Sequence, residues 1–355
     1  MSAAEKRDIL VWGAGAIGGT VAAYLARASH RVTCVDASAA HISAIAANGI
    51  RISGPVATFT ARVAVASPEE LNGTWPIALL AVKAQHSLEA ALKLREHLAA
   101  DGVVVTLQNG LSHVETARIV RPRRVFAGMV GFAADVLEPG HIRFGKGGDL
   151  VIGEPGRAAD ARVEECVSVL RDFEPRATTS DNIDASLWGK LGFVAILYGT
   201  ALGMSPLAKL FTDRRLFPLW YGLAHEFVGV AEAEGIAPVS FDDFDLAAFR
   251  PARPTEAAWD CLMTVASRLG LNAKPHSGMW RDLAVHKRRT EIDAQLVPIV
   301  ALGRRYGLPC RLLDCVCTMI HEIEAGTRVQ SDDALSELLA VVDRASTGQM
   351  QSKVS

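Results

Sequence analysis

Two patterns of apolar and polar residues divide the chain near residue 180. In the first part, short apolar runs rich in β-branched residues alternate with alanine-rich stretches of helical spacing. Such alternation is typical of a parallel sheet with helices on both faces, so we predict a doubly wound α/β domain over residues 1–178. The predicted strands are DILVW (8–12), RVTCV (31–35), IALLAV (77–82), VVVTL (103–107) and VFAGMV (125–130).

The second part has no further strand pattern. After about Asn182, long stretches with helical spacing are separated by segments that contain Gly and Pro, EGIAP (234–238) and YGLPCR (306–311). These features indicate an all-helical domain over residues 179–345. The apolar stretch 191–208 is interrupted by three glycines and a Ser-Pro pair, so we expect a buried helix and no membrane span. Residues 346–355 are polar, and we expect a disordered tail there.

Composition agrees with two domains and narrows the partners. The chain has 355 residues, a length at which a single hydrophobic core usually stops growing, and 50% of its residues are apolar, enough for two cores. Its formal net charge is −2, and its Lys and Arg residues are scattered, so we expect small-molecule partners and no nucleic acid. Six dispersed cysteines and no signal peptide at the start favour a reducing cytoplasm.

A cluster of cysteines and a histidine near the C-terminus could suggest a metal site. Cys310, Cys315, Cys317 and His321 lie close together in the sequence, but without the paired C-x-x-C spacing of zinc sites. Free cysteine packs as a small apolar residue. We therefore expect these side chains to be packed and predict no metal.

The first predicted strand is followed by G-x-G-x-x-G. Gly13, Gly15 and Gly18 stand between that strand and a predicted helix, whose first turn contains Ala16 and Ile17. In this context the glycines permit a tight turn, close approach of a pyrophosphate to the backbone, and close packing of helix on strand. The sequence therefore predicts a dinucleotide site.

Asp36 ends the second predicted strand, near the position where a carboxylate accepts hydrogen bonds from the adenosine ribose. A carboxylate there repels the 2′-phosphate of NADP, and Ala37 follows it instead of an arginine. We therefore predict NAD in preference to NADP. The alternative is that Asp36 only caps the next helix.

Two charged residues are candidates for proton transfer. Lys190 is followed by no other charge until Lys209, and burial would lower its pKa toward a range useful for catalysis. It could equally extend from the first turns of its helix to solvent. Glu291 could belong to a site, or could pair with Lys287 or Arg288 on an exposed helix face.

Five segments, in this order and at these intervals, resemble the ketopantoate reductase family of the 6-phosphogluconate-dehydrogenase-like group. They are GAGAIGG (13–19), LLAVKAQ (79–85), TLQNG (106–110), LWGKL (187–191) and RRTEID (288–293). The resemblance implies a Rossmann domain, a helical domain and an active site in the cleft between them.

The resemblance also implies roles for individual residues. Lys190 would be the general acid toward the carbonyl oxygen, and Glu291 would hold the substrate or tune the lysine. Asn109 would contact the nicotinamide ribose and the substrate, Lys83 can help to hold the 2′-phosphate of NADP, and Ser277 would bind substrate.

The sequence departs from the family at the substrate. Family members usually place asparagines one and two turns after the lysine, where this chain has Val194 and Tyr198. Two lost amides weaken the case for ketopantoate itself, since each missing hydrogen bond costs on the order of 1 kcal/mol. Arg281 is a candidate partner for a substrate carboxylate, because a guanidinium binds a carboxylate through two hydrogen bonds.

These features together predict a cytoplasmic, NAD-dependent oxidoreductase that exchanges hydride with a small hydroxy or oxo acid. One alternative is a genuine 2-dehydropantoate 2-reductase that uses NADPH. Others are a non-catalytic dinucleotide-sensing protein and an opine-type dehydrogenase that joins an amine to an oxo acid. Apolar helices in the second domain favour a homodimer.

Overall fold

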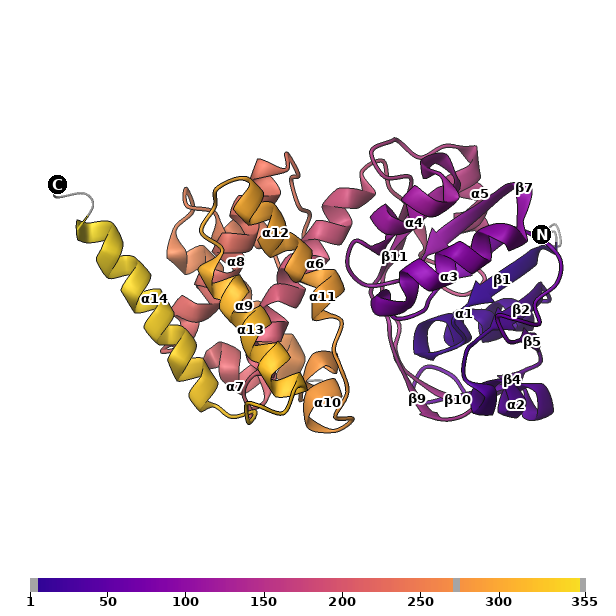
Figure 1. Ribbon diagram of the computed structural model, residues 1–355, viewed down its shortest axis with the longest axis horizontal. Coiled ribbons are helices and arrows are strands. Elements are labelled where there is room, and N and C mark those ends of the chain that lie inside the picture. Colours follow the sequence, from indigo (N-terminus) through magenta and orange to yellow (C-terminus); the bar gives the residue numbers. More distant parts are fainter. Residues whose placement is uncertain (1–5, 271–274, 352–355) are drawn as a thin grey trace. The chain divides into compact units, whose positions relative to one another are not determined.

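A computed structural model describes residues 6–270 and 275–351 of the chain. It divides into two compact units, Met1–Asp184 and Ala185–Ser355, which Figure 1 colours from indigo to magenta and from magenta to yellow. The division falls at residue 184, whereas we expected it at 178, because helix α6 begins only at Ile183.

An eight-stranded sheet forms the centre of the first unit, in the order β12-β11-β8-β7-β6-β1-β2-β5. β1 pairs in parallel with β2 on one side and with β6 on the other. Strands β2 and β5 therefore lie on one side of β1, and the later strands lie on its other side. β11 runs antiparallel to β8. The strands are β1 (Asp8–Trp12), β2 (Arg31–Val35), β5 (Ala64–Ala66), β6 (Trp75–Leu80), β7 (Leu98–Thr106), β8 (Val125–Val130), β11 (Leu150–Gly153) and β12 (Thr178–Thr179).

Helices cover both faces of this sheet. Ile9 and Val11 of β1 belong to the core beneath α1 (Ala16–Arg27) and α5 (Ala161–Leu170). Leu10 and Trp12 point to the opposite core, beneath α3 (Ser87–Leu94) and α4 (Ser112–Val120). Successive side chains of a strand point to opposite faces, which is why a strand covered on both sides is apolar throughout. The predicted doubly wound domain is confirmed.

A second, four-stranded sheet was not predicted. Its order is β4-β3-β10-β9, and α1 packs against it. These strands are short, and Gly and Pro residues separate β3 from β4 and β9 from β10, so none of them is long enough to give a clear alternating pattern in the sequence. The remaining elements of this unit are α2 (Ala39–Asn48), β3 (Ile50–Ser53), β4 (Phe59–Ala61), β9 (Ala133–Glu138) and β10 (His141–Lys146), with 3₁₀ turns at Ala84–His86, Arg95–His97 and Pro122–Arg124.

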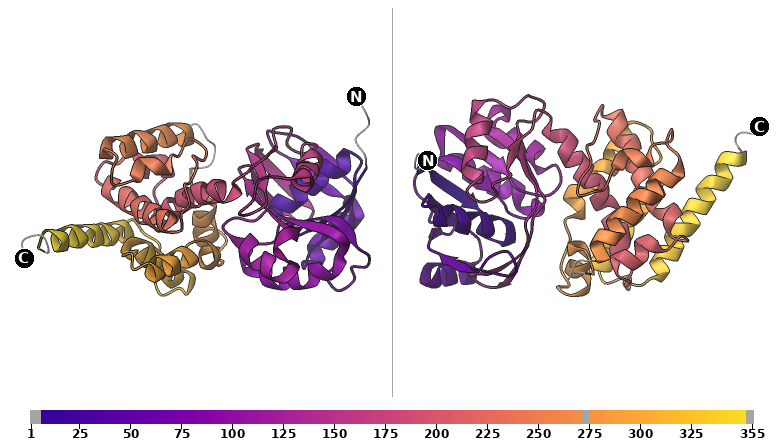
Figure 2. Two further views of the ribbon diagram at one scale, coloured as in Figure 1. Left: turned by 90° about the horizontal axis from the view of Figure 1, so that it is seen from above. Right: turned by 180° about the vertical axis from the view of Figure 1, so that it is seen from behind.

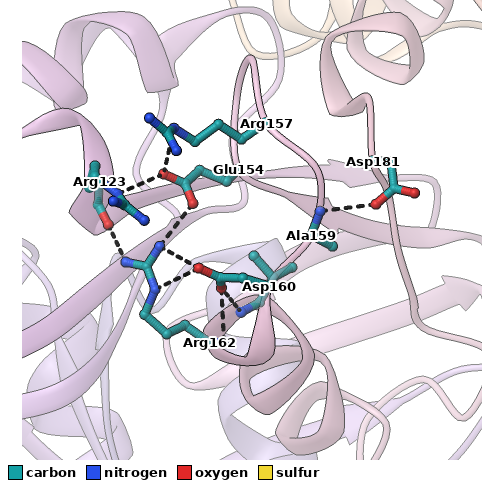
Figure 3. Close-up of polar contacts among 8 residues, drawn as sticks. Arg123, Glu154, Arg157, Ala159, Asp160, Arg162 and Asp181 are labelled. Carbon is teal, nitrogen blue, oxygen red and sulfur yellow. Dashed lines mark hydrogen bonds and ion pairs between the residues drawn. The ribbon is translucent and has the colours of Figure 1, made fainter.

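A polar cluster fixes the end of β11 (Figure 3). The buried Glu154 carboxylate lies 2.9 Å from Nη2 of Arg162 and 3.8 Å from Nε of both Arg123 and Arg157. Arg162 also binds Asp160, the N-cap residue of α5. A buried charge is costly without such partners, so the cluster joins β11 to α5 and is structural.

The second unit is helical, as predicted. In the described part of this unit, β pairing is limited to one isolated bridge between Phe241 and Phe244. Its elements are α6 (Ile183–Ala201), α7 (Leu207–Thr212), α8 (Phe217–Ala233), a 3₁₀ turn at Leu246–Phe249, α9 (Thr255–Gly270), α10 (Gly278–Ala284), α11 (Ile292–Gln295), α12 (Val297–Arg305), α13 (Arg311–Glu324) and α14 (Asp333–Gln351).

Two local expectations for this unit were wrong. The stretch 191–208 is not one helix, because α6 ends at Ala201 and α7 begins only after Pro206. Residues 346–351 are not a disordered tail but continue α14, the yellow helix at the C-terminal end of the chain in Figure 2. As a whole, α14 contacts α8 and α13. Residues 352–355 lie outside the described residues. No helix within the described residues is both long and apolar enough to cross a bilayer.

Candidate functional site

Gly13 in the loop after β1 and Gly18 in the first turn of α1 are required by the packing of the protein itself. Gly13 has a φ of 99°, and a Cβ there would lie 2.7 Å from the backbone nitrogen of Val82. A Cβ on Gly18 would lie 2.0 Å from the carbonyl oxygen of Gly13. The backbone of the loop after β1 therefore lies too close to the backbones of α1 and of the segment after β6 to leave room for a side chain at either glycine.

Gly15 differs, because no contact among the described residues requires glycine there. Its φ is −68°, which suits any residue, and a Cβ there would meet no atom of the described residues within 4 Å, apart from its chain neighbours and the backbone of its own helix. It is the N-cap of α1, and it has no side chain to cap the helix. Ala16 and Ile17 follow in the first turn. Open space at an uncapped helix N-terminus fits the pyrophosphate of a dinucleotide.

Asp36 is held beside this loop. Its Oδ2 accepts a hydrogen bond from the Ala14 N–H and its Oδ1 one from the Ser38 N–H, both at 2.9 Å. The N-cap of α2 is Ser38, whose hydroxyl accepts from the His41 N–H, so Asp36 is not the cap. Ala37 is exposed. Asp36 therefore lies beside the glycine loop and is not the helix cap, and its binding of a ribose diol stays a prediction.

The loops after β6 and β7 carry Lys83 and Asn109. Lys83 is partly buried and Asn109 is exposed. Between them, the buried side chain of Gln108 donates from Nε2 to the Val82 carbonyl at 2.9 Å and to the Ser87 hydroxyl at 2.7 Å. Gln108 therefore fixes the two loops to each other. Sequence reasoning used QNG only for its asparagine and missed this contact.

In the second unit, α6 carries Lys190 in partly buried surroundings. A Cβ on the preceding Gly189 would lie 1.9 Å from the Val239 carbonyl oxygen, so glycine permits the segment 237–241 to approach the helix. The ammonium lies 5.8 Å from the centroid of the Phe241 ring. Burial lowers the pKa of Lys190 to about 8, and the Glu291 carboxylate opposes that shift. A lysine extended into solvent would not show this shift.

Tyr198 lies two turns further along α6 and is fully buried. Burial raises the pKa of its hydroxyl well above the ordinary value, and the Glu291 charge raises the pKa further. Val194, between Lys190 and Tyr198 on the helix, is 7% exposed. The structure therefore brings Lys190, Tyr198 and Glu291 together within one unit.

Two residues that the sequence did not suggest fix the backbone next to Glu291. The backbone N–H and the hydroxyl of Thr290 both donate to Oε1 of Glu324, each at 2.7 Å. Glu324 is the last residue of α13, far from Thr290 in the sequence, so no local pattern could reveal the pair. It fixes the segment just before α11.

Ser277 and Arg281 lie at α10. The Ser277 hydroxyl is buried and accepts from the Trp280 N–H at 3.1 Å as the N-cap of that helix. Arg281 is partly buried in the same helix. Ser277 thus has a structural task, and a role for either residue in substrate binding stays a prediction.

Comparison with known proteins gives consistent matches along the chain. The family model "Ketopantoate reductase PanE/ApbA" matches residues 9–157, and the model for its C-terminal domain matches residues 182–324. A 2-dehydropantoate 2-reductase from Mesorhizobium japonicum is 30% identical over 342 residues, covering 89% of this chain and 97% of the relative. One from Archaeoglobus fulgidus is 26% identical and covers 90% and 98%.

Solved structures agree. A ketopantoate reductase from Ralstonia eutropha JMP134 is 26% identical with a TM-score of 0.75, covering 90% of this chain and 99% of that one. D-mandelate dehydrogenase with NADH and anilino(oxo)acetate shares the fold at 21% identity, with a TM-score of 0.78 and coverage of 90% and 98%. The protein therefore belongs to the ketopantoate reductase family of oxidoreductases that act on CH–OH groups.

Proposed function

We propose that this enzyme uses NAD(H) to interconvert a small hydroxy acid and the corresponding oxo acid, and that ketopantoate is not its best substrate. The observation that carries the proposal is the partly buried Lys190, whose pKa is lowered to about 8 by burial while Glu291 opposes the shift. A lysine with such a pKa changes its protonation state within the working range of an enzyme.

Lys190 would serve both directions of the reaction. The nicotinamide supplies or accepts the hydride when the coenzyme is bound. During reduction the Lys190 ammonium stabilises the negative charge that develops on the carbonyl oxygen and gives it a proton. During oxidation the neutral amine removes the hydroxyl proton. Glu291 keeps enough of the lysine protonated for reduction, and Asn109 would contact the nicotinamide ribose.

The substrate proposal rests on the face of α6 that follows Lys190. Val194 and Tyr198 are buried there in place of the asparagines that the family usually has. A polar substrate would lose two amide partners, at a cost on the order of 1 kcal/mol each. Because Val194 offers only apolar contact, we propose an acid with a less polar substituent. The same fold serves D-mandelate dehydrogenase, whose structure contains NADH and anilino(oxo)acetate.

Purified enzyme assayed with ketopantoate and a panel of 2-oxo acids with alkyl or aryl substituents tests this function. We expect NADH oxidation to be fastest with a member of the panel and at least about tenfold slower with ketopantoate, as two lost hydrogen bonds require. Fast turnover of ketopantoate with NADPH would instead show a genuine 2-dehydropantoate 2-reductase. Turnover that needs an added amine would show an opine-type enzyme, and no turnover at all would favour a dinucleotide sensor.

The coenzyme preference is proposed from Asp36. We expect the affinity for NADH to exceed that for NADPH by about a hundredfold, since a fixed carboxylate binds a diol and repels a phosphate. The double variant Asp36→Ser/Ala37→Arg should reverse the preference, because the exposed position 37 can hold a guanidinium without disturbing the core. Fluorescence titration with both coenzymes measures this. Asp36→Asn is the control, since it removes the negative charge and keeps a side-chain oxygen that accepts hydrogen bonds. Equal affinities of the wild type for NADH and NADPH would contradict the proposal.

We also propose a homodimer in the cytoplasm. A ketopantoate reductase from Staphylococcus aureus with the same fold is described as dimeric. Sedimentation analysis of the full chain would determine the subunit count.

A further inference from the structure

His41 is a buried histidine with a single arrangement of hydrogen bonds. It lies in the first turn of α2 and is 6% exposed. Its Nδ1 accepts a hydrogen bond from the Gly140 N–H at 3.1 Å, so the ring proton must be on Nε2. Nε2 then donates to the carbonyl oxygen of Ala14 at 2.8 Å. The neighbours thus select one neutral tautomer.

The residue that His41 binds is held at both of its backbone polar groups. The Ala14 N–H donates to Oδ2 of Asp36, and the Ala14 carbonyl accepts from His41. The described chain has no cis peptide bond. In a trans peptide, the carbonyl of one residue and the N–H of the next point in opposite directions. A carbonyl fixed toward His41 therefore directs the Gly15 N–H away from His41.

That N–H belongs to the glycine whose α-carbon faces open space. Within the described chain, no atom outside its own helix and its chain neighbours would lie within 4 Å of a Cβ on Gly15. Gly15 is also the N-cap of α1, and the N–H groups of a helix's first turn favour an anion. The histidine is in turn fixed by Gly140, in the turn between β9 and β10, where φ is 76°. The second sheet thus supports the glycine loop through this one side chain.

We propose that His41 is a positioning residue for the coenzyme. By holding the Ala14 carbonyl it fixes the orientation of the Ala14–Gly15 peptide, so that the Gly15 N–H donates to the pyrophosphate. Asp36 fixes the other end of Ala14, and the same carboxylate binds the ribose. The proposal rests on the proposed function only in that a dinucleotide binds at the glycine loop.

Two substitutions separate the two hydrogen bonds of the ring. The side-chain oxygen of His41→Asn can replace Nδ1 as the acceptor for Gly140, but its amide is too short to reach Ala14. The amide of His41→Gln can replace Nε2 as the donor to Ala14 and loses the bond from Gly140. ADP-ribose, which contains the pyrophosphate, and adenosine, which does not, are the probes, with affinities measured by calorimetry.

We expect His41→Asn to weaken ADP-ribose and NADH binding by about tenfold, the effect of one misplaced donor to a charged oxygen. Adenosine affinity should stay at the wild-type value, and His41→Gln should keep most of the ADP-ribose affinity. The reverse order of the two variants, or an equal loss for adenosine and ADP-ribose, would overturn the proposal.

His30 provides a matched control within the same unit. It is also buried, its Nδ1 accepts from the Arg7 N–H at 3.1 Å, and its Nε2 lies 2.8 Å from Asp172. His30→Asn should lower the melting temperature without changing either affinity. Wild-type enzyme that binds neither NADH nor ADP-ribose would refute the proposed function, whereas wild-type binding with unchanged affinity in His41→Asn would refute only the role of His41.

Discussion

Replacing Lys190 with methionine is expected to lower kcat by about a thousandfold, the middle of the range for a lost general acid. Methionine keeps an unbranched chain of similar length and removes the charge. The Kd for NADH should change little, because the coenzyme motif lies in the first unit. Stopped-flow assays with the best substrate and fluorescence titration of NADH measure the two quantities.

The exposed Lys209 of α7 is the control for loss of charge alone, and Lys209→Met should retain wild-type activity. If Lys190→Met kept more than a tenth of the wild-type kcat, Lys190 would not be the general acid.

The pH dependence of the wild-type rates provides a second test of Lys190. Because the Lys190 pKa is lowered to about 8, the reductive rate should fall as pH rises through about 8, and the oxidative rate should rise. Glu291→Gln should move both midpoints to lower pH, since its carboxylate raises the lysine pKa.

The local parts of the coenzyme loop and of the segment around Lys190 could be predicted from the sequence. The strand, the three glycines and the helix of the coenzyme loop lie within Asp8–Arg27, and their pattern follows from backbone geometry. Asp36 follows at a fixed distance. Lys190 stood out as an isolated charge in an apolar stretch, because lysine is rarely buried without a reason, but the sequence alone did not distinguish a buried lysine from one that extends to solvent. Each of these inferences needed only residues that are neighbours in the sequence.

The contacts that hold these groups in place could not be predicted. The sequence offered Lys287, four residues earlier, as a local partner of Glu291, but it could not reveal that the Glu291 carboxylate also raises the pKa of Lys190 on α6. Thr290 is held by Glu324, and His41 by Gly140, each pair separated by tens of residues. Such pairs depend on how helices and sheets pack, and neither composition nor periodicity carries that information.

Alanine at Gly15 and alanine at Gly18 are expected to have opposite effects. A Cβ at Gly18 would lie 2.0 Å from the Gly13 carbonyl oxygen and 2.9 Å from Cβ of Ala81, so α1 must move away from the sheet. Overpacking of this kind costs about 1–3 kcal/mol. Thermal unfolding of Gly18→Ala should therefore begin about 5 °C lower than that of the wild type.

Gly15→Ala should unfold at the wild-type temperature, since its Cβ would meet no other part of the described chain within 4 Å and its φ of −68° suits alanine. Its affinity for NADH should nevertheless fall by up to about a hundredfold, because the methyl group occupies the space that the pyrophosphate needs. Calorimetry and thermal unfolding of both variants separate the two causes. A Gly15→Ala enzyme that binds NADH normally would mean that the open space beside this glycine does not receive the coenzyme, and that the glycine loop serves only the packing of helix on strand.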